Sequence, residues 1–142
     1  MMTLFWRNWL VVWSIGVGLF GLVLYGAAYS ATTAPAAAIF ALFDNPLPPE
    51  PDRYLRFAIS LMGAVTFGWG VTSYAAFRAA WWLDAAAAAP VWRLITAAML
   101  LWYLIDSAAS VATGFWLNAV SNTVVLALYL VPVLASGVMR AR

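Results

Sequence analysis

The chain has 142 residues, of which 66% are hydrophobic and only 8% are charged, with a net charge of +2. A water-soluble domain carries about 25% charged residues, so this composition is typical of a membrane protein. Cysteine and histidine are absent, which excludes disulfides, zinc–thiolate sites and histidine-ligated metals. The few arginines form no basic stripe, so nucleic-acid binding is not expected.

Four segments are long and apolar enough to cross a bilayer, which takes about 20 residues per helix. These spans run from about residue 9 to 30, 55 to 77, 94 to 113 and 116 to 138. Each is apolar on all sides, as expected for a helix surrounded by lipid and by other helices. The predicted fold class is all-α: a polytopic membrane protein whose single domain, residues 1–142, is a bundle of four transmembrane helices.

Small residues mark the first two spans. The glycines in these spans are Gly16, Gly18, Gly21 and Gly26, followed by Gly63, Gly68 and Gly70. Small side chains let helix backbones approach closely in lipid, where the hydrophobic effect between helices is absent. We interpret the glycines as packing surfaces within the chain, and contact with a neighbouring subunit is the alternative.

The first loop joins a short apolar stretch to a proline-rich one. Residues 36–43 are apolar but too short to cross a bilayer, so we expect them to lie in the membrane interface or to dock on the bundle. Four prolines between Asp44 and Asp52 exclude helix interior and favour an extended path. We interpret this part as a stiff connector, and a docking surface for a partner outside the membrane is the alternative.

The remaining loops are short. Between Asp84 and Pro90 lie five consecutive alanines, and we expect the helix to continue through them and the chain to turn before Pro90, since proline disfavours helix in the preceding residue. The third loop, residues 113–115, is so short that the third and fourth spans should form a tight antiparallel hairpin.

The arginines set the expected orientation, because positive residues favour the cytoplasmic side. With four spans, one side of the membrane holds Arg7, Arg78, Arg93, Arg140 and Arg142. The other side holds Arg53 and Arg56. Both termini are therefore expected in the cytoplasm, and the expected location is a bacterial inner membrane.

Tryptophans gather near the expected cytoplasmic interface. They are Trp6, Trp9, Trp13, Trp81, Trp82 and Trp92. An aromatic belt of this kind is the rule in membrane helices. Contact of some of these indoles with a pigment or another ligand is the alternative interpretation.

Asp106 is the only acidic residue well inside a hydrophobic span. An ionised carboxylate at the centre of a membrane helix costs about 2.5–3.5 kcal/mol on insertion scales. We therefore expect Asp106 to be paired, neutralised or turned toward the protein interior. Ser110 lies one turn further along the same face.

Other polar residues are expected to reach the same depth. Asn118 and Asn122 lie one turn apart near the start of the fourth span, and Arg56 lies in the first turn of the second. The tight hairpin predicts an intramembrane polar cluster of Asp106, Ser110, Asn118, Asn122 and Arg56.

The predicted cluster has two interpretations. One is hydrogen bonding that fixes the helix register, worth about 0.6 kcal/mol per bond. The other is a proton, ion or substrate route, which intramembrane ionisable groups often mark. General acid–base catalysis usually needs a second titratable group within reach, and no phosphate loop, nucleophile elbow or metal-ligand spacing occurs. Enzymatic activity is thus disfavoured, and no catalytic residue, metal or obligatory cofactor is predicted.

Several short motifs carry a family resemblance. They are Asp44-Asn45-Pro46, Gly63, Gly68-Trp69-Gly70, Ile105-Asp106-Ser107 with Ser110, and residues 114–118 followed by Asn122. With these motifs the chain resembles small bacterial inner-membrane proteins with four spans and no established activity. In hydropathy it is similar to the broad DoxX-like group. The resemblance implies topology and no particular function.

Three functional hypotheses follow. The first is a non-enzymatic accessory or assembly subunit that packs against a larger membrane complex, respiratory or photosynthetic for example. The second is a small carrier or proton-linked transporter that uses Asp106, which would require a homo-oligomer because four spans are few for a monomeric carrier. The third is a pocket near Asp106 for a lipid, quinone or pigment.

Overall fold

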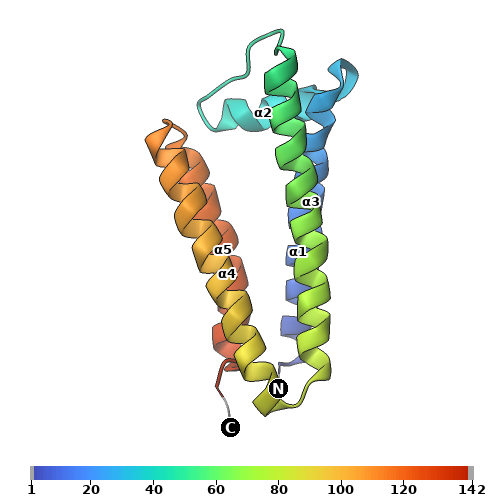
Figure 1. Cartoon of the computed structure of the whole chain (residues 1–142), viewed down its shortest axis with the longest axis vertical. Coiled ribbons are helices and arrows are strands. Elements are labelled where there is room, and N and C mark those ends of the chain that lie inside the picture. The colour runs from blue at the N-terminus through green and yellow to red at the C-terminus, as the bar shows by residue number, and fades with distance from the viewer. Residues whose placement is uncertain (1, 141–142) are drawn as a thin grey trace. The chain divides into compact units, whose positions relative to one another are not determined.

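The computed structural model describes residues 2–140, which form helices and connecting loops without a strand (Figure 1). Four helices are long and apolar enough to cross a membrane. They are α1 (Leu4–Tyr25), α3 (Arg53–Trp82), α4 (Ala85–Ala112) and α5 (Trp116–Ser136). The prediction of an all-α chain with four helices of spanning length is therefore confirmed. Arg142, which was counted for the orientation, lies outside the described residues.

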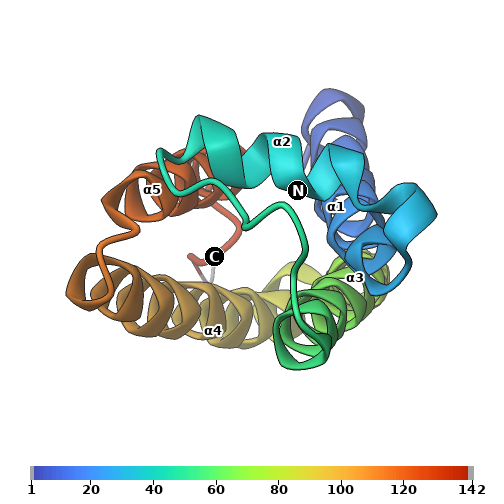
Figure 2. The same ribbon diagram turned by 90° about the horizontal axis from the view of Figure 1, so that it is seen from above.

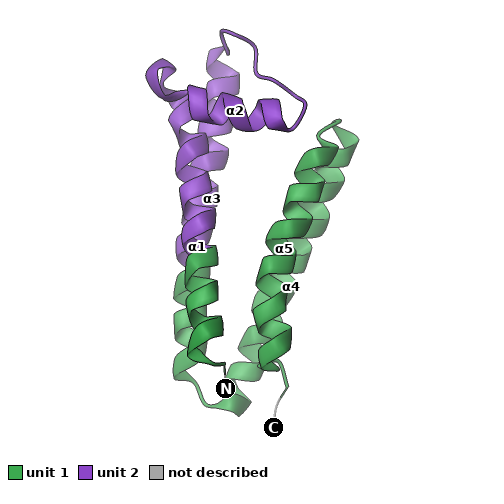
Figure 3. Cartoon of the chain, turned by 180° about the vertical axis from the view of Figure 1, so that it is seen from behind, with its two compact units in different colours: residues 1–13, 73–142 green, residues 14–72 purple. Residues whose placement is uncertain are grey.

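The chain divides into two compact units (Figure 3). One, Ser14–Thr72, holds most of α1, the short helix α2 (Ala34–Leu42) and the first part of α3. We call it the glycine unit. The other, residues 1–13 and 73–142, holds the start of α1, the end of α3, and α4 and α5. We call it the hairpin unit.

Close contact between α1 and α3 defines the glycine unit. A Cβ added to Gly70 would lie 2.8 Å from the backbone nitrogen of Gly18 and 2.8 Å from the carbonyl oxygen of Ser14. Added to Gly21 or Gly63, it would likewise collide with backbone atoms of the facing helix. At these three positions the interpretation of glycines as packing surfaces within the chain is confirmed.

The short apolar stretch of the first loop docks on its own unit. The buried cluster there consists of Leu24, Ala27, Ala36 and Ile59. Ala36 comes from α2, so this helix covers the adjoining ends of α1 and α3. The proline-rich stretch that follows is not helical, and α3 begins where Asp52 Oδ1 accepts hydrogen bonds from the backbone nitrogens of Tyr54 and Leu55 at 2.8 and 2.9 Å.

The expected turn before Pro90 is wrong. Helix α3 ends at Trp82, and the chain turns at Leu83 and Asp84. Asp84 then caps α4, because its Oδ1 accepts a hydrogen bond from the nitrogen of Ala87 at 2.9 Å. The five alanines thus begin the next helix, with Pro90 inside it. The cap contributes about 1 kcal/mol against about 3 kcal/mol for a proline inside a helix, so burial of Ala89 and Trp92 in the hairpin unit must supply the rest.

In the hairpin unit, α4 and α5 lie side by side along their length, as Figures 1 and 2 both show. The connection is one tight turn in which Gly114 adopts the left-handed φ of 85°. The nitrogen of Phe115 donates to the carbonyl of Ser110 at 2.7 Å, which closes the end of α4. The predicted tight antiparallel hairpin is confirmed.

Aromatic side chains form the core of the hairpin unit. Phe77 lies between Trp92 and Tyr129, with ring centroids 5.6 and 5.9 Å away and near-parallel planes. Trp13 packs against the edge of this stack, 5.9 Å from Tyr129. Phe77 and Tyr129 are 0% exposed and Trp92 is 1% exposed. Trp13 and Trp92 therefore belong to the core, and an interfacial belt does not describe them.

Candidate functional site

The turn at Gly114 brings Asp106 opposite the first turn of α5. Asn118 Nδ2 donates to Asp106 Oδ1 at 3.1 Å and to Ser110 Oγ at 2.9 Å. Ser110 Oγ in turn lies 2.7 Å from the carbonyl oxygen of Asp106 and 3.1 Å from its Oδ1, so its single proton is shared between them. We call these three residues the Asp106 clamp. Ser110 is buried, whereas Asp106 and Asn118 are half-buried.

The donor and acceptor roles in the clamp can be kept whether Asp106 is ionised or neutral. Oδ1 is an acceptor in both bonds, and a carboxyl group keeps an acceptor oxygen when it is protonated. Its donors are a hydroxyl and an amide, which are neutral. The clamp therefore suits a carboxyl group that joins two helices in either protonation state.

Two further side-chain bonds continue along the hairpin. Asn122 Nδ2 donates to Ser107 Oγ at 3.4 Å, and Asn122 is buried. Tyr103 and Thr123 share a hydrogen bond of 3.1 Å between their hydroxyl groups. Asn122 thus bonds to Ser107, the residue that follows Asp106 in α4. These polar pairs lie at successive depths and pin α4 to α5 in one register.

Arg56 makes its hydrogen bonds within the glycine unit. Its Nη1 donates to Thr33 Oγ1 at 2.9 Å and to the carbonyl oxygen of Ala27 at 3.3 Å. Its Nε donates to the carbonyl oxygen of Pro51 at 3.1 Å. The guanidinium group therefore ties the first turn of α3 to the end of the first loop and to the segment between α1 and α2. Of the predicted cluster, the structure brings together Asp106, Ser110 and Asn118 in direct contact.

Tryptophan side chains make a second set of polar contacts, which sequence reasoning missed. The indole nitrogen of Trp9 donates to the carbonyl oxygen of Leu128 at 2.8 Å. That carbonyl would normally accept from the residue four positions on, which is Pro132 and has no N–H. Trp13 Nε1 also donates to α5, at the carbonyl oxygen of Val125 at 3.0 Å, although the residue four positions on, Tyr129, has an N–H. For Trp9 the available signal was the proline in an apolar span, since a freed carbonyl needs a donor.

The chemistry open to these sites is limited. Among residues 2–140, no three histidine, cysteine, aspartate or glutamate side chains gather as a metal site would require. The donors to Asp106 Oδ1 are the neutral groups of Ser110 and Asn118, an arrangement that holds helices in register. The geometry of the clamp is that of an interhelical joint.

Replacing Asn118 with alanine should lower the free energy of unfolding by about 1 kcal/mol, since it removes two interhelical bonds of about 0.6 kcal/mol each. Asp106→Asn should cost less, because the amide oxygen can still accept from Ser110 and Asn118. Reversible unfolding in mixed micelles measures both. An Asp106→Asn loss as large as that of Asn118→Ala would show that the clamp needs an ionised carboxylate.

Comparison with known proteins does not assign a family or a function to the chain. No family model matches the chain, and neither the curated proteins nor the solved structures include a match to it.

Proposed function

We propose that the chain is an accessory or assembly subunit of a larger complex in a bacterial inner membrane, for example a respiratory or photosynthetic complex. The observation that carries this proposal is the Asp106 clamp. An intramembrane carboxyl group is costly to insert, and here its bonds serve to join α4 to α5. A rigid helical hairpin can serve as a packing surface for other subunits of a membrane complex without carrying out a reaction.

The outer faces of the hairpin support the proposal. Large apolar side chains stand out from both helices, and examples are Leu104 and Ile105 on α4 with Val120 and Val124 on α5. Only 17% of the most apolar stretch of α4 is buried within the chain. In a bilayer such a surface meets lipid or another membrane protein, where association depends on close packing of fixed shapes. A clamped hairpin presents such a fixed shape.

The orientation proposed for this subunit has both termini in the cytoplasm. It rests on the arginines, since Arg7, Arg78, Arg93 and Arg140 lie in or near the first turns of α1, the last turns of α3, the first turns of α4 and the segment after α5. Fusing a reporter that is active only in the cytoplasm to each terminus in turn would test it.

A carrier that uses Asp106 is the second candidate. It is favoured by the position of Asp106, which is half-buried and lies directly after Ile105, a residue that is 70% exposed. A carboxyl group near a helix surface can face a route formed between subunits of an oligomer. In that case ionisation of Asp106 would be essential to function rather than incidental.

Native electrophoresis after extraction in a mild detergent separates the two candidates. An accessory subunit should migrate with partner chains in a fixed ratio, and Asp106→Asn should leave that complex intact because the clamp keeps its acceptor. Migration of the wild-type chain as a homo-oligomer alone would contradict the subunit proposal. Loss of substrate uptake in Asp106→Asn, at normal abundance, would favour the carrier. Gly68→Ala, an exposed change on α3, serves as the control for detergent handling.

A further inference from the structure

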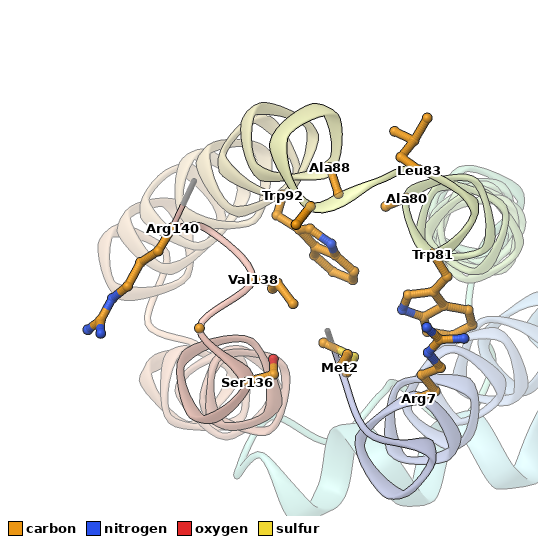
Figure 4. Close-up of a pocket in the computed structure, with 12 residues that line it drawn as sticks. Met2, Arg7, Ala80, Trp81, Leu83, Ala88, Trp92, Ser136, Val138 and Arg140 are labelled. Atoms are coloured by element: carbon orange, nitrogen blue, oxygen red, sulfur yellow. The ribbon is translucent and has the colours of Figure 1, made fainter. Parts of the chain in front are cut away.

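A pocket of about 300 Å³ opens at one end of the hairpin unit (Figure 4). Its walls come from the first turns of α1 and α4, the last turn of α3 and the chain after α5. Arg7, Trp81, Trp92 and Ser136 supply polar atoms to the lining. All of these residues lie in the hairpin unit, and none belongs to the Asp106 clamp.

The pocket has unused hydrogen-bond donors in its wall. Arg7 Nε and Trp81 Nε1 are both buried, and neither has a hydrogen-bond partner among residues 2–140. A buried donor that is left without an acceptor destabilises the folded chain. The two side chains lie against each other, with the Arg7 guanidinium carbon 5.6 Å from the centre of the Trp81 ring (Figure 4). Rotation of the long Arg7 side chain would turn Arg7 Nε toward a group inside the pocket and uncover the Trp81 indole that it lies over.

The charge of the lining is positive. Of the twelve lining residues, two are arginines and none is acidic. Arg140 extends away from the pocket in Figure 4, so Arg7 is the cation that lies against it. The acidic residue nearest in sequence to a lining residue is Asp84, which is exposed and caps α4. A ligand that satisfies this wall must therefore offer acceptor oxygens and negative charge.

Size and position narrow the class of ligand further. About 300 Å³ is at the lower limit of small-molecule sites, so the pocket can take a head group but not a whole lipid. The walls are formed at helix ends, where helices of spanning length meet the head groups of a bilayer. Apolar residues such as Leu83 and Val138 also line the pocket, beside the polar ones. Arginine suits phosphate in particular, because its planar fork pairs with two phosphate oxygens.

We propose that this pocket binds the phosphate of an anionic phospholipid head group, with Arg7 pairing to the phosphate oxygens and Trp81 Nε1 donating to one of them. The acyl chains stay outside, along the apolar helix surface. Basic pockets between helices at a membrane surface bind acidic head groups in this way. The proposal is independent of any partner complex, so it stands or falls separately from the subunit role.

Native mass spectrometry of the full chain in detergent tests the pocket, with phosphatidylglycerol, phosphatidylcholine and inorganic phosphate as separate probes. Phosphatidylglycerol should bind saturably and more tightly than phosphatidylcholine. Arg7→Gln should weaken phosphatidylglycerol binding at least about tenfold, as expected for the loss of a charged hydrogen bond. Trp81→Phe, which keeps an aromatic ring but removes the indole N–H, should weaken it about threefold to tenfold.

Matched controls lie on the same helix end. Arg78→Gln removes the same charge from an exposed site outside the pocket, and Trp82→Phe changes a neighbouring indole that is 82% exposed. Both should leave the affinity within about twofold of the wild type, inside the scatter expected for surface changes. Circular dichroism and gel filtration of each variant establish that it is folded.

Three results would overturn the proposal. Equal weakening by Arg7→Gln and Arg78→Gln would show attraction to net charge and no defined pocket. Equal binding of phosphatidylcholine and phosphatidylglycerol would show that head-group charge is not recognised. Inorganic phosphate that displaces phosphatidylglycerol at equal concentration would assign the pocket to a free anion in place of a lipid.

Discussion

Replacing Gly63 with alanine should lower the free energy of unfolding by about 3 kcal/mol, at the upper end of the range for overpacked sites. A Cβ at this position collides with the backbone of Tyr25, Gly21 and Leu24 on α1. Backbone atoms cannot rotate away as a side chain can, so α1 and α3 must separate. In lipid this separation loses the van der Waals contact that holds the helices together. Reversible unfolding in mixed micelles measures the loss.

Gly68→Ala on the same helix is the matched control. A Cβ there meets nothing within 4 Å, and Gly68 is exposed. Its expected effect is between zero and a gain of about 1 kcal/mol, since alanine is the better helix former. A loss as large as that of Gly63→Ala would contradict the packing described for the glycine unit. If Gly68→Ala instead dissociated an oligomer, the exposed glycine would belong to a subunit contact.

Helical spacing in the sequence already places these glycines on different faces of the helix, although it does not show which helix packs against them. Gly63 and Gly70 are seven residues apart and lie on one face of the helix, while Gly68 is turned away from it. The sequence pattern therefore predicts a face of close approach on the second span. That α1 supplies the facing backbone is a tertiary fact, because any helix with small residues could do so.

Helix ends were predicted less well than the spans, for a physical reason. Hydropathy reports which residues can enter lipid, whereas backbone hydrogen bonds decide where a helix stops. Helix α3 therefore runs to Trp82, past Arg78, although the apolar run ends near residue 77. In the same way α4 begins at Ala85, far before the predicted start near residue 94.

Contacts local in the sequence were predictable and distant ones were not. A turn of three residues must bring Asp106 and Ser110 near Asn118, so the clamp follows from spacing alone. The wall of the pocket joins Arg7 to Trp81 and Ser136, which lie far apart along the chain. Arg56 was assigned to the cluster by its expected depth, but its bonds to Ala27 and Thr33 depend on how the first loop folds.

Replacing Phe77 with alanine should lower the free energy of unfolding by about 3–5 kcal/mol, as for other buried aromatic side chains. Phe77 is 0% exposed and its ring lies between Trp92 and Tyr129, at 16° and 19° to their planes. The change leaves a cavity that neither neighbour can fill without leaving its own contacts. Tyr129 is also held by its hydrogen bond to Thr96 at 2.9 Å, which limits such movement.

Phe57→Ala is the control for Phe77→Ala, because Phe57 lies on the same helix and is 65% exposed. In a bilayer most of this exposed side chain meets lipid in the folded and unfolded states alike, so the expected change is within about 0.5 kcal/mol. Near-ultraviolet circular dichroism adds a local readout, since the indoles of Trp13 and Trp92 lie beside Phe77. Only Phe77→Ala should reduce that signal. Equal losses of stability for the two variants would mean that α3, α4 and α5 are held by lipid and loops, and that the aromatic stack is not their common core.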